Sequence, residues 1–118
     1  MFASTVHDLI RFGQALAHGR LLPVELVREM LTGVDVGAES HPFTHPAYGL
    51  GVMLDRQGKG TGIVGHGGGG PGYGAALFRR YGGSTQASTV AVLSNGGGGA
   101  HVERAALALL AAVEHQSS

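Results

Sequence analysis

The sequence T-G-I-V-G-H-G-G-G-G-P-G-Y-G-A-A-L-F-R-R, residues 61–80, decides the fold class of this 118-residue chain. A strand-like apolar segment, 61–66, precedes a run of glycines, and a second apolar segment, 74–80, follows it. Many of the chain's 22 glycines lie in two clusters, at 65–74 and 96–99. Glycine concentrated in this way indicates backbone that bends sharply or approaches another group closely. We therefore predict two strands joined by a glycine loop.

Two further strands are predicted on either side of this pair. From residue 47 to residue 55, apolar residues alternate with glycine and polar residues, which is the period of a half-buried strand. Residues 57–60, Gln-Gly-Lys-Gly, predict a turn after it. Residues 88–94 contain an unbroken apolar core and predict a fourth strand, the most buried of the set. The short spacing between these strands favours an antiparallel meander.

The first part of the chain has the pattern of two helices. Thr5 and Asp8 form a capping box at the start of the first helix, and Gly19 ends it. Pro23 then occupies a first-turn position of the second helix, where its missing N–H costs nothing. Gly33 ends that helix, so the two helices form an αα-hairpin.

A last helix is predicted from about residue 101 to residue 115. Its expected apolar face consists of Val102, Ala105, Ala106, Leu109, Ala112 and Val113.

The chain is therefore predicted to be one α+β domain, residues 1–118. The helical hairpin occupies 1–33, and a surface loop with two prolines occupies 34–46. The antiparallel sheet follows at 47–95, and the C-terminal helix, 100–116, covers one face of that sheet.

Composition excludes several classes of function. Eight basic and eight acidic residues give a net charge of zero, which argues against a nucleic-acid or anionic-membrane platform. The absence of cysteine excludes disulfides, thiolate catalysis and cysteine-ligated zinc. No apolar run reaches the roughly 20 residues that a membrane span requires. Residues 1–4 lack a signal-peptide pattern, and the cellular compartment stays open.

Three other interpretations of the glycine- and histidine-rich segments fail on spacing. The oxyanion motif of an α/β-hydrolase would require Gly-x-Ser-x-Gly elsewhere, and the chain has none. A phosphate loop would require Gly-Lys-Ser/Thr opening a helix, whereas Pro71-Gly72-Tyr73 leads into a strand. His41 and His45 are separated by Pro42, which denies them a shared helix face, so we expect no zinc and no other cofactor.

Three segments, in this order, resemble the penicillin-recognising serine hydrolases, especially class C β-lactamases and their esterase and peptidase relatives. The resemblance spans nearly the whole chain, although each motif alone is weak. The segments are Ser4-Thr5 through Asp8-Leu9-Ile10-Arg11-Phe12 with Gly19-Arg20-Leu21-Leu22; Tyr48-Gly49-Leu50-Gly51-Val52, with valine in place of the usual tryptophan; and Val64-Gly65-His66-Gly67-Gly68 with Pro71-Gly72-Tyr73 and the later Val90-Ala91-Val92-Leu93-Ser94-Asn95.

The resemblance implies a site along the third segment. His66, Gly67 and Gly68 match the family's His-x-Gly motif, on a strand that borders the active site. By resemblance, His66 would bind the substrate carboxylate or polarise the surroundings of the nucleophile, and the N–H of Gly69 would supply half of the oxyanion hole. Asn95 corresponds to an asparagine near the substrate in relatives. The implied substrates are β-lactams, peptides or esters. Without the resemblance, His66 would be interpreted as a strand-end histidine packed against glycine backbone.

The chain departs from the family pattern in its nucleophile and base. No serine has a lysine three positions later, and no Tyr-x-Asn or Ser-x-Asn motif is present. We therefore expect a carboxy-terminal segment of such an enzyme that is inactive alone, because an acyl-enzyme needs a nucleophile. The other hypothesis is a non-catalytic assembly fragment. In both cases an exposed strand edge predicts a partner, either a second copy in a homodimer or the missing N-terminal part.

Overall fold

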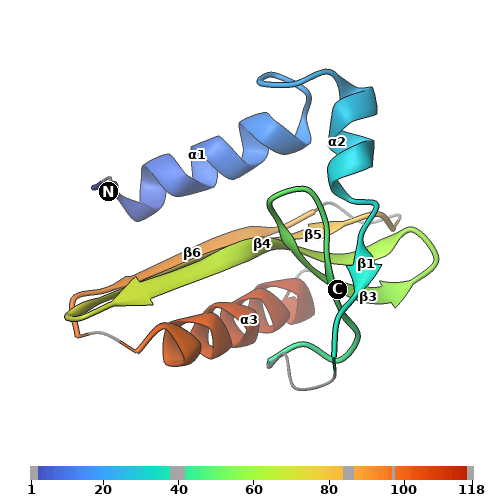
Figure 1. The fold of residues 1–118 in the computed structure, drawn as a ribbon. Helices are drawn as coiled ribbons and strands as arrows, with labels where there is room; N and C mark the ends of the chain where they lie inside the picture. The colour runs from blue at the N-terminus through green and yellow to red at the C-terminus, as the bar shows by residue number, and fades with distance from the viewer. Residues whose placement is uncertain (1–2, 38–41, 84–86, 97, 117–118) are drawn as a thin grey trace.

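The computed structural model describes residues 3–37, 42–83, 87–96 and 98–116. A single antiparallel sheet lies between two helical layers, as Figure 1 shows. Helices α1 (Val6–Ala17) and α2 (Val24–Met30) lie on one face, and helix α3 (Gly99–Gln116) covers the other face. The predicted α+β architecture, a helical hairpin followed by a meander and a covering helix, is confirmed.

The helical hairpin begins and turns where its sequence predicts. The hydroxyl of Thr5 accepts a hydrogen bond from the Asp8 N–H at 3.1 Å, which satisfies one of the free donors of the first turn. Gly19 adopts a φ of 73°, the left-handed conformation that ends a helix cheaply only in glycine. Pro23 is the N-cap of α2.

The sheet follows the order of the sequence, and all neighbouring strands are antiparallel. Its strands are β1 (Val34–Asp35), β2 (Pro46–Tyr48), β3 (Met53–Gly58), β4 (Thr61–Gly70), β5 (Tyr73–Tyr81) and β6 (Thr89–Ser94).

Two expectations about the first half of the sheet were wrong. Residues 47–55 do not form one strand, because the chain reverses at Leu50-Gly51 and makes the β2–β3 hairpin. The N–H of Gly49 donates to the carbonyl of Val52 at 2.8 Å, and Gly51 has a φ of 75°. Apolar–glycine alternation fits a strand and such a turn equally well. The predicted loop 34–46 also contains β1, which pairs with β2.

The last strand and the last helix differ from expectation in which residues they bury. β5 buries more of its residues than β6, which lies at the edge of the sheet with only β5 beside it. In α3 the buried residues are Val102, Ala106 and Leu110, spaced four apart, whereas Ala105, Leu109 and Ala112 are exposed. The predicted stripe therefore included an exposed flank of the helix and missed Leu110, which is fully buried.

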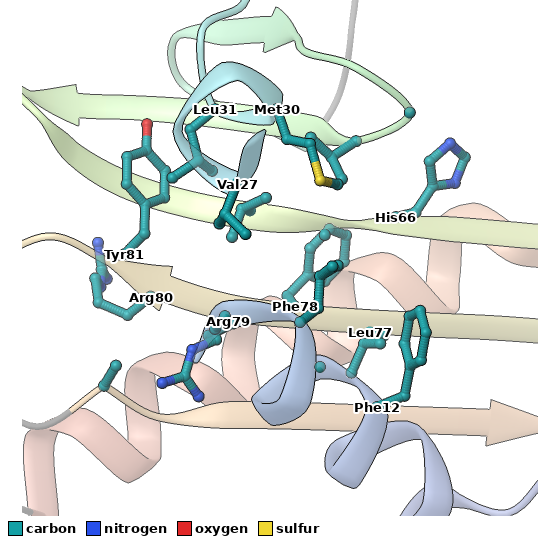
Figure 2. Close-up of a pocket in the computed structure, with 18 of the residues that line it drawn as sticks. Phe12, Val27, Met30, Leu31, His66, Leu77, Phe78, Arg79, Arg80 and Tyr81 are labelled. Atoms are coloured by element: carbon teal, nitrogen blue, oxygen red, sulfur yellow. The ribbon is translucent and has the colours of Figure 1, made fainter. Parts of the chain in front are cut away.

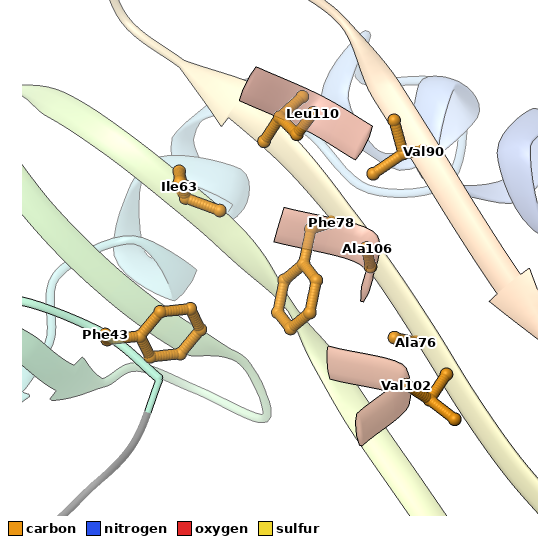
Figure 3. Packing of buried hydrophobic residues seen from close by; sticks show 8 residues of the cluster. All are labelled: Phe43, Ile63, Ala76, Phe78, Val90, Val102, Ala106 and Leu110. Atoms are coloured by element: carbon orange, nitrogen blue, oxygen red, sulfur yellow. The ribbon is translucent and has the colours of Figure 1, made fainter. Parts of the chain in front are cut away.

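The main core lies between the sheet and α3, and Figure 3 shows its packing. Phe78 and Leu110 are fully buried there, and the ring of Phe43 meets that of Phe78 edge to face at 5.6 Å. A smaller cluster packs β2 and β3 against α2, with Leu54 fully buried. The core members are Phe43, Ile63, Ala76, Phe78, Val90, Val102, Ala106 and Leu110 in the first cluster, and Ala47, Val52 and Leu54 in the second.

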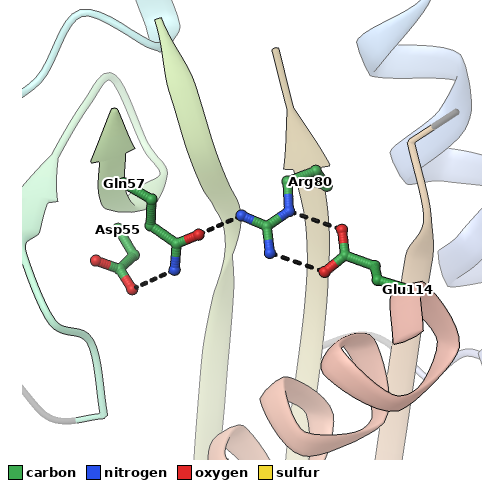
Figure 4. Close-up of polar contacts among 4 residues, drawn as sticks. All are labelled: Asp55, Gln57, Arg80 and Glu114. Atoms are coloured by element: carbon green, nitrogen blue, oxygen red, sulfur yellow. Dashed lines mark hydrogen bonds and ion pairs between the residues drawn. The ribbon is translucent and has the colours of Figure 1, made fainter. Parts of the chain in front are cut away.

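A polar network crosses the α3 face of the sheet, as Figure 4 shows. The buried carboxylate of Asp55 accepts from the His45 N–H at 2.8 Å and from the Gln57 amide at 3.2 Å. Gln57 in turn accepts from Arg80. Arg80 donates two bonds of 2.7 Å to Glu114, near the end of α3. The network therefore connects β3, β5 and α3.

Candidate functional site

The glycine run after His66 is a strand and not the loop that the sequence suggested. β4 continues through Gly70, and each of its glycines has a partner on β5, from Gly67 opposite Ala76 to Gly70 opposite Tyr73. The chain reverses only afterwards, at Pro71-Gly72, where Gly72 has a φ of 79°. β5 supplies the hydrogen bonds that keep the glycines extended despite their weak strand propensity.

Beyond His66, β4 extends further than its other neighbour, β3, so no described strand pairs with that backbone edge. The β3–β4 pairing ends at Met53 opposite Gly65. In an antiparallel strand, alternate residues direct their N–H and C=O groups to opposite neighbours. The Arg56 N–H donates to the His45 carbonyl, which shows which residues of β3 direct their backbone groups toward β2 and which toward β4. The pairing of β3 with β4 then shows the same for the residues of β4. Gly67 and Gly69 therefore direct their backbone groups away from β5, past the end of β3.

The two faces of this glycine strand have different surroundings. On the α3 face, a Cβ at Gly67 would lie 2.0 Å from the carboxylate of Glu103, and one at Gly69 would lie 3.1 Å from Gly99. A side chain at Gly67 would have to displace the Glu103 carboxylate, and one at Gly69 would require only a small shift of Gly99. On the opposite face, a Cβ at Gly68 would meet no atom within 4 Å. The strand is open on that face at Gly68, whereas the ring of Tyr73 covers Gly70, the next position on the same face.

The side chain of His66 lies on the same face as the open position at Gly68. His66 pairs with Leu77, and Leu77 lies below Gly13 of α1, which places all three on the α1 side of the sheet. The Nδ1 atom of His66 contacts the carbonyl of Gly67, and Nε2 lies 3.0 Å from the hydroxyl of Tyr48. Because a carbonyl only accepts, Nδ1 must carry the proton. A neutral His66 therefore accepts from Tyr48 at Nε2.

Tyr48 is a residue of this site that the sequence did not reveal. It lies in β2, next to the Leu50-Gly51 turn, and its ring meets the ring of His66 edge to face with centroids 6.0 Å apart. Treating residues 47–55 as one strand hid this contact. A turn at Leu50-Gly51, which glycine at the second loop position favours, would have predicted the β2–β3 hairpin that carries Tyr48.

A cavity of about 530 Å³ lies between the sheet and the helical hairpin, and Figure 2 shows its lining. His66 lies at one end of the labelled residues and Tyr81 at the other, with Val27 and Met30 of α2 between them. Most of the walls are apolar. The charged residues that line the cavity are Arg28, Arg79 and Arg80.

Arg79 is a half-buried cation in this lining. It donates to the hydroxyl of Thr89, and its other terminal nitrogen lies 3.4 Å from Nε2 of His18, at the end of α1. Burial lowers the pKa of the Arg79 guanidinium from its ordinary value, because the charged form loses hydration. Among the described residues, the contacts of Arg79 are thus to a hydroxyl and an imidazole.

The structure does not place Asn95 beside the other predicted site residues. Asn95 follows the end of β6, where Ser94 is opposite Gly74, and Gly74 is opposite Gly69. Two strand spacings, about 10 Å, therefore separate Asn95 from β4, with β5 between them. His66, Gly67, Gly68 and Gly69 lie together on one strand, and the role of Asn95 stays a prediction.

The described part of the chain contains neither a metal-binding cluster nor a membrane-spanning helix. Among those residues, no group of three or more histidine, aspartate or glutamate side chains could hold a metal ion. No helix in the described ranges is both long enough and apolar enough to span a bilayer.

Comparison with known proteins identifies the family. The family model described as Beta-lactamase matches residues 2–114. Among solved structures, the chain is similar to a D-stereospecific amidohydrolase from Streptomyces sp., with 32% identity and a TM-score of 0.57. This similarity covers 75% of the chain and 24% of the amidohydrolase, so the chain spans about a quarter of that protein's length. No curated protein matches the chain. As its motifs predicted, the chain belongs to the beta-lactamase family of serine hydrolases.

Proposed function

We propose that this chain provides the substrate-lining strand of a serine hydrolase that cleaves amides or esters through an acyl-enzyme. In this proposal β4 borders the reacting bond, and the N–H of Gly69 is one donor of the oxyanion hole. Gly67 and Gly68 leave room for the substrate along the strand. The nucleophile belongs to a Ser-x-x-Lys segment outside these 118 residues.

One observation carries the proposal: β4 continues past the end of β3 as a bare strand with an open edge. Gly67 and Gly69 direct their N–H groups to that edge, and Gly68 is open on the face that holds His66. A tetrahedral intermediate needs N–H donors aimed at its developing negative charge. A glycine strand can approach the reacting carbonyl because no side chain intervenes.

His66 fits the role of a substrate-binding group beside this edge. Its ring is held on two sides, by the carbonyl of Gly67 and by the hydroxyl of Tyr48. A ring held in this way keeps one orientation while a ligand binds, which reduces the entropy lost on binding. When His66 is protonated, both nitrogens donate, and the side chain can bind a substrate carboxylate.

The similar amidohydrolase suggests the first substrates to test. That protein is named for acting on D-configured substrates by amide hydrolysis. We extend this to the present chain as a proposal, so D-amino-acid amides come first, with β-lactams and simple esters as comparison substrates.

The test replaces the matching quarter of the Streptomyces amidohydrolase with this chain and measures hydrolysis of a D-amino-acid amide. Gly69→Pro removes the proposed donor, and Gly69→Ala keeps it while adding the same Cβ. Because the Gly69 N–H points away from β5, neither change removes a β4–β5 hydrogen bond. We expect Gly69→Pro to lower turnover about 10²–10³-fold relative to Gly69→Ala.

Two outcomes contradict the proposal. Equal turnover of the two variants, in chimeras with the circular dichroism of the parent enzyme, would show that the Gly69 N–H stabilises no oxyanion. The isolated 118-residue chain should not hydrolyse nitrocefin or p-nitrophenyl esters. Turnover by that chain, abolished in His66→Ala, would show that the nucleophile lies within it.

A second candidate function is assembly without catalysis. It is favoured by the position of β6 at the edge of the sheet.

A further inference from the structure

Tyr48 places a second polar group beside His66, although the two residues lie on strands that do not pair with each other. The residue between these strands is Met53 of β3, which pairs with Tyr48 of β2 on one side and with Gly65 of β4 on the other. His66 is the next residue of β4, so the side chain of Tyr48 reaches it past the end of β3. The hydroxyl lies 3.0 Å from Nε2 of His66, and the two rings meet edge to face.

Both side chains of this pair are accessible to a ligand. Tyr48 is 41% exposed, and His66 is exposed as well. Their hydrogen bond therefore does not serve to satisfy polar groups within a core. On the face of β4 that carries His66, a side chain at Gly68 would meet no atom within 4 Å, so a ligand has space beside the pair.

The protonation state of His66 decides what the pair can bind. The contact of Nδ1 with the Gly67 carbonyl places a proton on Nδ1, so neutral His66 accepts at Nε2 from the Tyr48 hydroxyl. The pair then has no donor left for a ligand. Protonated His66 donates from Nε2 as well and no longer accepts from Tyr48. The hydroxyl and the Nε2–H are then two donors, 3.0 Å apart in this structure, that can both turn to one acceptor group.

The charges around the cavity favour an anionic acceptor. Arg28 and Arg79 line the cavity, and within the described ranges no aspartate or glutamate does. Arg79 shares the face of His66, and its guanidinium contacts the end of α1. The acidic neighbour is Glu103, which lies beneath Gly67 on the opposite face, the face that α3 covers. The positive charge on the cavity side therefore attracts an anion to the face that carries His66.

We propose that the Tyr48 hydroxyl is a substrate-binding donor, which together with the Nε2–H of protonated His66 binds a free carboxylate of the substrate. Because the two donors are 3.0 Å apart, each can bond to one oxygen of the same carboxylate. The substrate class is a D-configured amide or peptide with a carboxylate close to the reacting bond. The pair belongs to the site of the proposed function, on which this inference rests, and Tyr48 adds a second donor to the role given there to His66.

The first experiment measures binding of an unreactive carboxylate to the 118-residue chain. N-acetyl-D-alanine carries the carboxylate, and N-acetyl-D-alaninamide is the matched neutral ligand. The ring nitrogen shifts of His66 show when both nitrogens are protonated, and the amide shifts of Gly67 and Gly68 report binding. With His66 protonated, we expect the carboxylate to bind about tenfold or more tightly than the amide, because charge-assisted hydrogen bonds are stronger. With His66 neutral, we expect this preference to disappear.

The second experiment distinguishes a donor to the ligand from a residue that only orients His66. When both ring nitrogens carry protons, the choice of tautomer has no effect on binding. Under that condition we expect Tyr48→Phe to weaken binding of N-acetyl-D-alanine about tenfold and to leave binding of the amide unchanged. Tyr81→Phe is the matched control, because Tyr81 lies at the other end of the cavity (Figure 2) and should leave both affinities unchanged.

Three results would overturn the proposal. Equal affinity for the two ligands, or binding of neither, would show that the pair is not a carboxylate site. Wild-type affinity in Tyr48→Phe with His66 protonated would show that Tyr48 does not contact the ligand. Equal weakening by Tyr48→Phe and Tyr81→Phe would show an effect on the fold instead of on a contact. Each of these results leaves the proposed oxyanion donor untouched, because binding of an unreactive ligand involves no turnover, and the two Gly69 chimeras test that donor separately.

Discussion

The two faces of the sheet are covered by helices, α1 and α2 on one face and α3 on the other, and the two layers differ in how closely they pack. Against α3, the side chains of Phe78 and Leu110 have no exposed surface. Against α1, no helical residue is buried, and a cavity of about 530 Å³ lies between the helical hairpin and the sheet. His66 and the open position at Gly68 lie on this second face. The α3 face, the closed face, therefore holds the larger core. The α1 face, the open face, leaves a cavity that is available for binding, although Leu54 is fully buried against α2 there.

Two consecutive arginines show the same difference. Arg80 points to the α3 face, where Glu114 receives two hydrogen bonds and raises the pKa of the guanidinium. Arg79 points to the α1 face, where burial lowers its pKa and its contacts are with Thr89 and His18. Within the described ranges, the α3 face places a carboxylate beside its arginine, and the α1 face does not.

The largest expected effect comes from truncating the closed face. Leu110→Ala removes a fully buried side chain and leaves a cavity, which costs about 2–5 kcal/mol of unfolding free energy. Leu16→Ala on α1 removes a side chain that already lines a cavity, and we expect a cost of about 1 kcal/mol. Urea denaturation of both variants measures the difference. Equal costs would show that the α1 face is as well packed as the α3 face.

The sequence predicted the helices of the open face better than the burial of the closed face, for a physical reason. Helix caps and turn glycines are local signals, so Thr5, Gly19 and Pro23 marked the hairpin correctly. The burial of α3 depends on which side of the helix meets the sheet. Because α3 has apolar residues on both flanks, its sequence does not show which side meets the sheet. Leu109 was therefore predicted to be in the core, although it is exposed.

A second expected effect, of intermediate size, tests the two arginines. Glu114→Gln keeps the shape of the side chain but removes the charge that balances Arg80, and we expect a loss of about 1–2 kcal/mol. His18→Ala removes an exposed contact of Arg79, and its cost should stay within about 0.5 kcal/mol. Thermal or urea unfolding compares the two. If His18→Ala lowers the unfolding free energy more than Glu114→Gln does, the contact between His18 and Arg79 stabilises the α1 face more than its length indicates.

The roles of the candidate-site residues stay predictions, and the sequence did not predict the shape of the strand that carries them. The motif placed His66 and the three glycines after it together, and the structure has them on one strand. It did not predict that these glycines are extended, because glycine alone favours a bend as readily as a strand. The extended conformation of these glycines depends on β5, whose residues 73–76 are their pairing partners. Pairing with another strand leaves no signal within the glycine run itself.

The smallest expected effect concerns the one histidine that lies at the open site. Tyr48→Phe removes the donor to Nε2 of His66 and leaves the contact of Nδ1 with the carbonyl of Gly67. We expect the Nδ1–H tautomer to dominate in the wild-type chain and the Nε2–H tautomer to gain population in the variant, at a stability cost of about 1 kcal/mol or less. The nitrogen chemical shifts of the imidazole ring measure this directly. Tyr73→Phe, at another partly exposed tyrosine, is the matched control. If the tautomer is unchanged in Tyr48→Phe, the Gly67 carbonyl alone holds the ring. The open face would then orient His66 through the backbone of β4, and Tyr48 would contribute only its ring contact.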